Sequence, residues 1–328
     1  MSSGLLLVVA LALVFDLLNG VHGSSNIVGT MISSRAFRPW AALLTTVVAE
    51  LVGPFIFGAA VARTIGSEIV RADVITIRSL IACLIGAIIW SLLTWFLGIP
   101  SSPSHGLIGG LIGAAWVGAG IVSLRVGGLI KVFAALFAAP LIGFGLGFIL
   151  TRLIYFLAAG ASPRINEFFK RGQFITALVL AISQGANDAQ KAVGIIVLAM
   201  VITGVMPGFD VPLWITAISA VGLALGTVLA GWRLIRTVGG KFYKIRPVHS
   251  FSAQLTSALI LFGSSLGGWP VSVTHVTSSA VIGVGSSERL GKVRWGVAGE
   301  ILTAWILTIP ASALLSAGVY GLIMRAQI

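Results

Sequence analysis

Four long segments of the chain contain no Asp, Glu, Lys or Arg: residues 79–124, 132–151, 251–287 and 301–324. Each is close to, or longer than, the roughly 20 residues that a helix needs to cross a bilayer. Charged residues make up 9% of the chain and hydrophobic residues 57%, whereas an ordinary soluble domain has about 25% charged residues. A soluble domain of this composition would expose too much apolar surface to water, so we expect the surface to face lipid.

Inside a bilayer every backbone polar group must be hydrogen-bonded within the protein, and only helices and closed β-barrels achieve this. The chain lacks the alternating segments of about ten residues that are typical of a membrane barrel. The sequence therefore predicts an all-α polytopic membrane protein. The first apolar run follows Met1-Ser2-Ser3-Gly4 with no basic residue before it, so we interpret it as a transmembrane helix and not as a cleaved signal peptide.

The net charge of +12 comes from basic residues that cluster between the apolar runs, for example in segments 164–171 and 233–246. Membrane proteins mark their cytoplasmic loops in this way. The positive charge is thus explained by topology, and we expect the lipid bilayer, and no nucleic acid, as the partner of these surfaces.

Two pairs of polar motifs recur in the same order along the chain. The amide motifs, residues 19–26 and 183–190, are rich in Gly, Asn and Gln and lie between apolar runs. The hydroxyl motifs, residues 98–105 and 268–275, both read Gly, apolar, Pro, then residues that include Ser or Thr, then His. This repetition predicts a tandem duplication of one transmembrane unit.

The duplication divides the chain into a first transmembrane repeat over residues 1–160, a cytoplasmic linker over 161–171 and a second transmembrane repeat over 172–328. Loop 232–249 contains five basic residues and loop 203–211 contains none, which places the former in the cytoplasm together with the linker. The loop charges of the first half indicate its orientation less clearly. They permit inverted repeats with both termini outside, an architecture that is common in transporters.

The amide motifs carry candidate cation ligands. Their glycines favour a broken helix in each repeat, and oxygen atoms of Asn26, Asn187 and Asp188, with freed backbone carbonyls, suit a hard cation such as Na⁺. A helix cap or a polar turn at the membrane surface is the structural alternative. Because two such motifs stand in matching places and polar groups inside a membrane are costly, we favour a functional role.

The hydroxyl motifs suit an anion. Ser101, Ser102 and Ser104 in the first half, and Ser272 and Thr274 in the second, supply hydroxyl donors at the start of an apolar helix. The N–H groups of a helix N-terminus also attract negative charge. Each motif therefore predicts a re-entrant hairpin with a donor-rich tip. A Pro-initiated turn with N-capping residues is the alternative.

Other polar residues within apolar runs are weaker candidates. His105 and His275 can donate to an anion or shuttle a proton, although a structural hydrogen bond is the more common role. Gln173 and Gln190 are donors near the second amide motif, and Glu50 and Glu300 are candidates for ion coupling. The sequence contains no nucleotide-binding loop, catalytic triad signature or Cys/His metal spacing, so we expect neither an enzyme nor a bound cofactor.

Together these motifs resemble the PiT family of inorganic phosphate transporters, which includes related sulfate permeases. Residues 15–26 are similar to the family pattern F-D-x-x-N-G-F-H-D-x-A-N, and residues 185–196 to G-A-N-D-x-Q-K-x-x-G-I-I. The hydroxyl motifs are similar to P-S-S-T-S-H and P-V-S-T-T-H, and the resemblance extends over nearly the whole chain.

The resemblance implies inverted repeats, two re-entrant hairpins, a homodimer in a bacterial inner membrane, and phosphate symport with Na⁺ or H⁺. By position it assigns cation binding to Asn26, Asn187 and Asp188. It assigns the anion to a set of hydroxyl and amide side chains: Ser101, Ser102, Ser104, Ser272, Thr274, Gln173 and Asn187.

The chain departs from the family pattern at three site positions. Gly23 stands where the family has Asp, and Pro103 and Val273 replace a Thr in each hydroxyl motif. The missing carboxylate indicates fewer bound Na⁺ ions, H⁺ coupling or a rearranged site. The missing hydroxyls weaken hydrogen bonding to a tetrahedral anion, which keeps a sulfate or other oxyanion permease, and a non-transporting regulatory homologue, as alternatives to phosphate transport.

Overall fold

The computed structural model describes residues 2–34, 36–99, 101–241, 246–288, 290–293 and 295–326. Within these residues the protein is almost entirely helical, and its β structure is an isolated bridge between Val70 and Leu124. Seven of the described helices are long and apolar enough to cross a membrane. The predicted all-α membrane fold is therefore confirmed.

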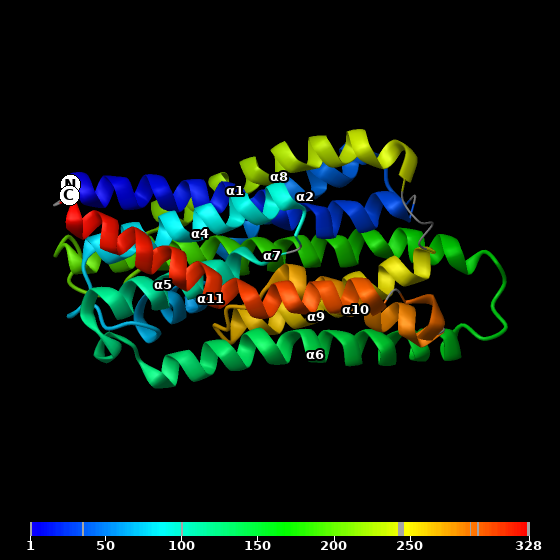
Figure 1. Ribbon diagram of the computed structural model, residues 1–328. Helices are drawn as coiled ribbons and strands as arrows, with labels where there is room; N and C mark the ends of the chain where they lie inside the picture. The colour runs from blue at the N-terminus through cyan, green and yellow to red at the C-terminus, as the bar shows by residue number, and fades with distance from the viewer. Residues whose placement is uncertain are drawn as a thin grey trace.

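The first half of the chain contains three long helices that flank a helical hairpin (Figure 1). Its helices are α1 (Ser3–Ser33), α2 (Pro39–Ile56), the short α3 (Ala60–Arg63), a π-helical turn (Thr64–Glu68), α4 (Ile77–Leu97), α5 (Pro103–Ala119), a 3₁₀ turn (Ile121–Ser123) and α6 (Val126–Leu157). The hairpin is formed by α4 and α5.

The second half repeats this order without a counterpart of α3 among the described residues. Its helices are α7 (Ile165–Ile202), α8 (Leu213–Lys241), α9 (Pro247–Leu266), α10 (Val273–Glu288), a 3₁₀ turn (Leu290–Lys292) and α11 (Trp295–Arg325). Here the hairpin is formed by α9 and α10. Because α7 begins at Ile165, much of the segment 161–171 that we expected to be a linker is helical.

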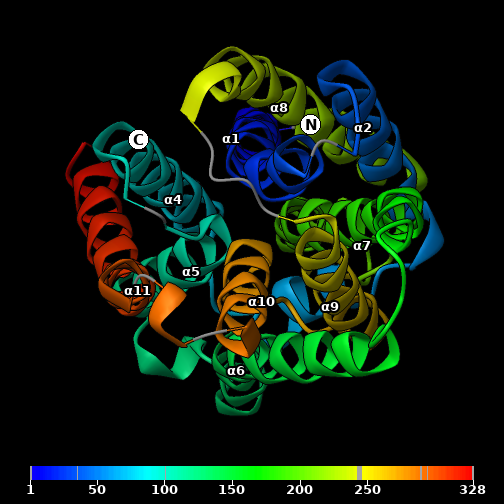
Figure 2. The same cartoon turned by 90° about the vertical axis from the view of Figure 1, so that its right-hand side faces the viewer.

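The two halves run in opposite directions. In Figure 1, α1 starts at the end that carries both termini and α7 starts at the opposite end, beside the α6–α7 connection. Helix packing repeats the same symmetry: α1 lies on α8 as α7 lies on α2, and α6 lies on α10 as α11 lies on α5 (Figure 2). Each half therefore packs mainly against the other one, in the arrangement expected of inverted repeats.

The α4–α5 and α9–α10 hairpins enter from opposite ends, and their tips meet inside the protein (Figure 1). Gly98 and Gly268, with φ of 69° and 66°, make the sharp turns that end α4 and α9. The rings of His105 and His275, from the first turns of α5 and α10, are 4.3 Å apart between centroids. The two hydroxyl motifs, 170 residues apart in sequence numbering, are thus brought together.

The glycines of the amide motifs do not break their helices. We expected an interruption there, but α1 and α7 continue through residues 19–26 and 183–190. The glycines instead allow close helix packing: a Cβ on Gly20 would lie 2.0 Å from the carbonyl oxygen of Leu223, and one on Gly185 would lie 2.3 Å from that of Glu50. Small residues bring membrane helices together in this way.

A methyl group at this contact should therefore destabilise the protein. We expect Gly185→Ala to lower the thermal unfolding temperature in detergent, because overpacking costs about 1–3 kcal/mol or more when backbone must move. Gly145→Ala is the matched control, since no atom of the described part of the chain lies within 4 Å of its added Cβ. Equal unfolding temperatures for the two variants would show that α2 and α7 are not in close contact.

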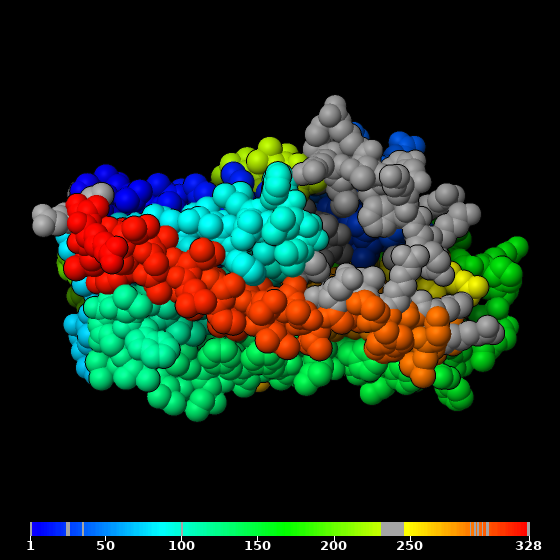
Figure 3. Space-filling model, viewed as in Figure 1, coloured from blue at the N-terminus to red at the C-terminus, as the bar shows by residue number. Residues whose placement is uncertain are grey.

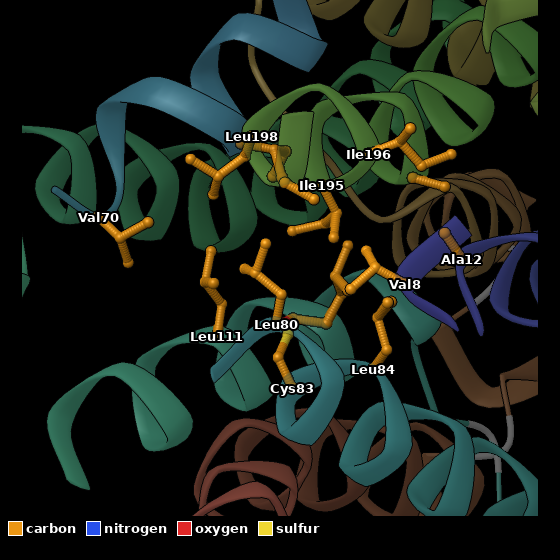
Figure 4. Packing of buried hydrophobic residues seen from close by; sticks show 14 of the residues in the cluster. Val8, Ala12, Val70, Leu80, Cys83, Leu84, Leu111, Ile195, Ile196 and Leu198 are labelled. Atoms are coloured by element: carbon orange, nitrogen blue, oxygen red, sulfur yellow. Dashed lines mark hydrogen bonds between the residues drawn. The ribbon is translucent and has the colours of Figure 1, made fainter. Parts of the chain in front are cut away.

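The apolar core lies where α1, α4, α5 and α7 meet. Figure 4 shows Val8, Leu84, Leu111 and Ile195 converging there, and all four are at most 1% exposed. The outer surface is apolar as well. Helix α11 crosses the face drawn in Figure 3 and exposes large side chains that suit contact with lipid: Leu302, Ile306, Leu307, Leu314 and Leu322.

Candidate anion and cation site

A buried lysine occupies the point where α7 meets the two hairpin tips. Lys191 is fully buried, and its Nζ donates to Asp188 Oδ1 at 2.5 Å, to Ser104 Oγ at 2.6 Å and to the Val271 carbonyl at 2.9 Å. Ser104 belongs to the first hairpin and Val271 to the second. One ammonium group therefore links both hairpins to the second amide motif.

Asn187 attaches the same motif to the turn of the second hairpin. Its Nδ2 donates to the Trp269 carbonyl at 3.1 Å, and its Oδ1 accepts from the Val271 N–H at 3.3 Å. The amide thus satisfies backbone groups that the turn between α9 and α10 leaves without helical partners. Asn187 and Asp188, both predicted from the sequence, do lie at the hairpin tips.

The predicted hydroxyl residues have different surroundings. Ser102 and Ser272 cap α5 and α10, where each Oγ accepts from a backbone N–H three residues later at 3.3 Å. Ser104 contacts Lys191 as described, and half-buried Thr274 occupies the matching place in the first turn of α10. Ser101 is directed toward α4 instead: its Oγ lies 2.5 Å from Oγ1 of Thr94, which belongs to that helix.

The first amide motif faces the second one across the same region. A Cβ on Gly23 would lie 2.4 Å from Gln184 Nε2 and 3.8 Å from Asp188 Oδ2. The carboxylate that the family pattern places at position 23 would therefore stand beside Asp188, and in this chain it is absent. The side chain of Asn26 lies outside the described residues.

A second buried carboxyl group adjoins this contact. Glu50 on α2 is fully buried and accepts from Gln184 Nε2 at 2.9 Å and from Thr227 Oγ1 at 2.6 Å. Gln184 thus separates Glu50 from the place where the side chain of residue 23 would be. Of the two glutamates that we considered for ion coupling, Glu50 lies next to the amide motifs, and the side chain of Glu300 is outside the described residues.

Gln173 does not join the site. It precedes Asn187 by 14 residues on the continuous helix α7, which is about 21 Å at 1.5 Å per residue. Its Oε1 accepts from Ser34 Oγ at 2.7 Å and its Nε2 donates to the Pro247 carbonyl at 3.1 Å. Ser34 and Pro247 line a cavity of about 860 Å³ at the end of the molecule that carries the α6–α7 connection. Gln173 therefore lies beside this cavity, and not at the hairpin tips.

Three other polar candidates have structural partners or packing roles. Gln190 accepts from the N–H groups of Val61 and Ala62 and donates to the Gly58 carbonyl, so it holds the start of α3. His105 Nδ1 lies 3.0 Å from Ser102 Oγ. The ring of His275 stacks on Trp305, 3.8 Å between centroids, and no described residue hydrogen-bonds its nitrogens.

Lys191 and Gln184 are the site residues that we did not single out from the sequence. A lysine inside a run of apolar residues is itself a signal, because an intramembrane charge is costly unless it is paired. Its partners Ser104 and Val271 are 87 and 80 residues away in the chain, so no local pattern indicates them. Gln184 is uncharged, and its role is recognised only from its hydrogen bond to Glu50.

The arrangement suits an anion, monovalent or multivalent, beside a carboxylate whose charge is balanced by a lysine. The N-termini of α5 and α10 converge at the tips, and helix N-termini stabilise negative charge. Hydroxyl groups surround them, and the Asp188 carboxylate is paired with an ammonium. Among the described residues no cluster of three or more His, Cys, Asp or Glu side chains is placed to hold a metal ion.

Comparison with known proteins agrees with this geometry. The sequence matches the phosphate transporter family over residues 19–162 and again over residues 158–316, so that each half of the chain is matched. A Bacillus subtilis protein described as "Probable low-affinity inorganic phosphate transporter" is 42% identical over 96% of each chain. A Rhizobium meliloti protein with the same description is 40% identical over 95% of this chain and 94% of its own.

A solved structure described as "The sodium-dependent phosphate transporter" has the same fold. It superposes with a TM-score of 0.90 over 99% of this chain and 100% of its own, at 23% sequence identity. The family matches, the relatives at 42% and 40% identity and the shared inverted fold lead to one assignment: this chain belongs to the phosphate transporter family.

Proposed function

We propose that this protein moves inorganic phosphate across the plasma membrane by symport with a cation, Na⁺ or H⁺. The observation that carries the proposal is the meeting of the two hairpin tips, which brings the N-termini of α5 and α10 and their hydroxyl groups to one buried point. Membership of the phosphate transporter family supports phosphate as the anion. The relatives' descriptions support phosphate and do not name the coupling ion.

We assign phosphate binding to residues at the two hairpin tips. Ser102, Ser104, Ser272 and Thr274 surround the anion, and Asn187 and Asp188 hold the turn and the adjacent charge. Neutral hydroxyl and N–H donors suit transport, because an anion that is bound too tightly cannot leave. A binding role for Ser101 and Gln173 has less support, since Ser101 is hydrogen-bonded to Thr94 and Gln173 lies beside the cavity at the end of the molecule.

Radiolabelled phosphate uptake into proteoliposomes tests the proposal. Purified protein is assayed with an inward Na⁺ gradient, with an inward H⁺ gradient and with neither. We expect one gradient to accelerate uptake and unlabelled phosphate to compete better than sulfate. Stronger competition by sulfate would make the protein a permease for that oxyanion, and absence of transport of both anions by folded protein would indicate a regulatory homologue. Homodimerisation also stays a prediction, which the mass of the detergent-solubilised protein would test.

Loss of one hairpin hydroxyl should weaken phosphate binding. We expect Ser104→Ala to raise the KM for phosphate about tenfold, because a hydrogen bond to a charged group contributes about 1.5–3 kcal/mol. Ser67→Ala is the control, as its hydroxyl donates to the Arg63 carbonyl in an exposed turn. A KM equal to that of the wild type would place the anion elsewhere.

A further inference from the structure

A carboxyl group on α1 is buried without a hydrogen-bond donor. Asp16 is fully buried, and neither of its carboxyl oxygens has a hydrogen-bond partner among the described residues. It lies 13 residues, about 20 Å, after the start of α1 at Ser3, and so near the middle of a bilayer. An ionised carboxyl group in such a place is very costly unless donors or an opposite charge compensate it, and it takes up a proton instead.

Helix α8 packs directly against this carboxyl group. A Cβ on Gly222 would lie 3.2 Å from the Cβ of Asp16, and Ser219, one turn earlier on α8, is the hydroxyl residue that faces it. The side chain of Ser219 is fully buried, and its Oγ has no hydrogen-bond partner in the described part of the chain. A protonated Asp16 needs one acceptor of this kind, whereas a hard metal ion takes a shell of oxygen ligands. The contact therefore suits a proton better than a metal ion.

The charged groups that act on Asp16 belong to the proposed phosphate site. They are Asp188 and Lys191 on α7, which form an ion pair with each other. Gly23, two turns after Asp16 on the same face of α1, lies beside Asp188. The described side chains of α8, residues 213–230, include no titratable group. The other buried titratable residues on described helices that pack against α1 are Glu50, Cys83, His105 and His275, and α1 itself carries His22.

The internal repeat distinguishes Asp16 from the other buried carboxyl group. Gly20 and Gly185 make mirrored contacts, against α8 and α2, which aligns the two halves of the chain at an offset of 165 residues. By this offset Ala181 takes the place of Asp16, and the carboxyl group at the contact of α7 with α2 comes from Glu50 instead. Glu50 accepts two hydrogen bonds from side chains. Each of the mirrored contacts thus contains one buried carboxyl group, and the one on α1 has no donor among the described residues.

The position of Asp16 links its protonation to the anion. Phosphate at the hairpin tips would add negative charge beside Asp188 and Lys191, the two groups that act on Asp16. In the low dielectric of a protein interior, added negative charge favours the protonated form of a nearby carboxyl group. By linkage, protonation of Asp16 favours phosphate binding by the same factor. A site whose two ligands stabilise each other tends to carry both together, as symport requires.

We propose that Asp16 binds the proton that is transported with phosphate, and that Ser219 accepts its hydrogen bond in the protonated state. The inference rests on the proposed function and deepens it, since it names the coupling ion and the residue that holds it. It also gives a role to a buried carboxyl group that the phosphate site leaves unused.

Asp16→Asn separates coupling from movement of phosphate, because asparagine has the shape of a protonated aspartic acid and cannot release a proton. Phosphate uptake into proteoliposomes is measured at one external pH, with the internal pH either equal or one unit higher and with the membrane potential held at zero. Exchange of labelled for unlabelled phosphate is measured at equal pH. We expect the higher internal pH to accelerate wild-type uptake at least about fivefold and to leave the uptake by Asp16→Asn unchanged. Exchange by the variant should persist, since it requires no release of the proton.

Asp210→Asn is the matched control, because Asp210 is an exposed carboxyl group, 4.0 Å from Arg63. It should respond to the proton gradient as the wild type does. Acceleration of Asp16→Asn by the proton gradient would overturn the inference, as would loss of exchange by folded Asp16→Asn protein. A wild type that responds to a Na⁺ gradient and not to a proton gradient would overturn it as well.

Asp16→Ala is the second variant, since alanine stands at the matching position of the other repeat. A protonated carboxyl group without donors contributes little to stability, so at least one of the two variants should fold. Failure of both to fold would show that Asp16 has a structural role, and it would overturn the inference. If the wild type shows neither uptake nor exchange, the proposed function fails and the inference fails with it. If the wild type transports phosphate and Asp16→Asn keeps its proton coupling, the assignment to Asp16 alone fails.

Discussion

Asp188→Asn is expected to reduce phosphate uptake at least about 100-fold, because it leaves the Lys191 ammonium buried without its counter-charge. Removing one partner of a buried ion pair costs about 3–5 kcal/mol. We expect this cost to fall on the conformation that binds phosphate, and each 1.4 kcal/mol then lowers its population by about a factor of ten. The Asp188–Lys191 pair has side chains at most 3% exposed, so water cannot take over the lost role. The measurement is initial uptake by protein whose folded fraction is known from size-exclusion chromatography.

The double variant Asp188→Asn with Lys191→Met separates stability from transport. It removes both charges, and replacing a whole buried pair by neutral groups is far less destabilising than removing one partner. We expect this protein to fold better than Asp188→Asn and still to transport poorly. Uptake by Asp188→Asn at the rate of the wild type would show that the second amide motif is not part of the site.

Glu50→Gln is expected to lower uptake about tenfold or more with little change in stability. A buried ionisable group inside a membrane is by default functional, and Glu50 lies one side chain away from the contact between the two amide motifs. Glutamine has nearly the same shape and loses only the ability to ionise. The neighbouring amide can adapt, because Gln184 Oε1 has no hydrogen-bond partner among the described residues and could accept from the new Nε2 after the Gln184 amide turns over.

Uptake and thermal unfolding of Glu50→Gln are measured together. Glu68→Gln serves as control, since Glu68 pairs with Lys131 at 2.9 Å in a partly exposed place. We expect the control to retain transport. If Glu50→Gln transports normally across a range of pH, the carboxyl group has only a structural role between α2, α7 and α8.

The sequence predicted those features that composition and repetition determine. Charge-free runs indicate helices in lipid, and the two hydroxyl motifs, each with Pro and His, indicate hairpins with polar tips. The structure shows these tips in contact through His105 and His275. Asn187, Asp188 and Ser104 were also predicted, because polar residues that recur in matching places of a membrane protein are expensive to keep without a role.

Features that depend on contacts between distant segments were not predicted. Gly20 and Gly185 suggest a helix break when only the local sequence is considered, whereas they are needed for close contact with Leu223 and Glu50. The role of Lys191 depends on oxygen atoms from both hairpins. Gln173 was placed with the site because it is near in sequence, although 14 residues of helix separate it from Asn187.

The packing of α1 on α8, of α2 on α7 and of α6 on α10 has a consequence for how such a chain can arise. Neither half has a closed interior of its own, because the faces that each would bury are covered by helices of the other. A half-length ancestral chain could have formed this arrangement only as two copies inserted into the membrane in opposite orientations.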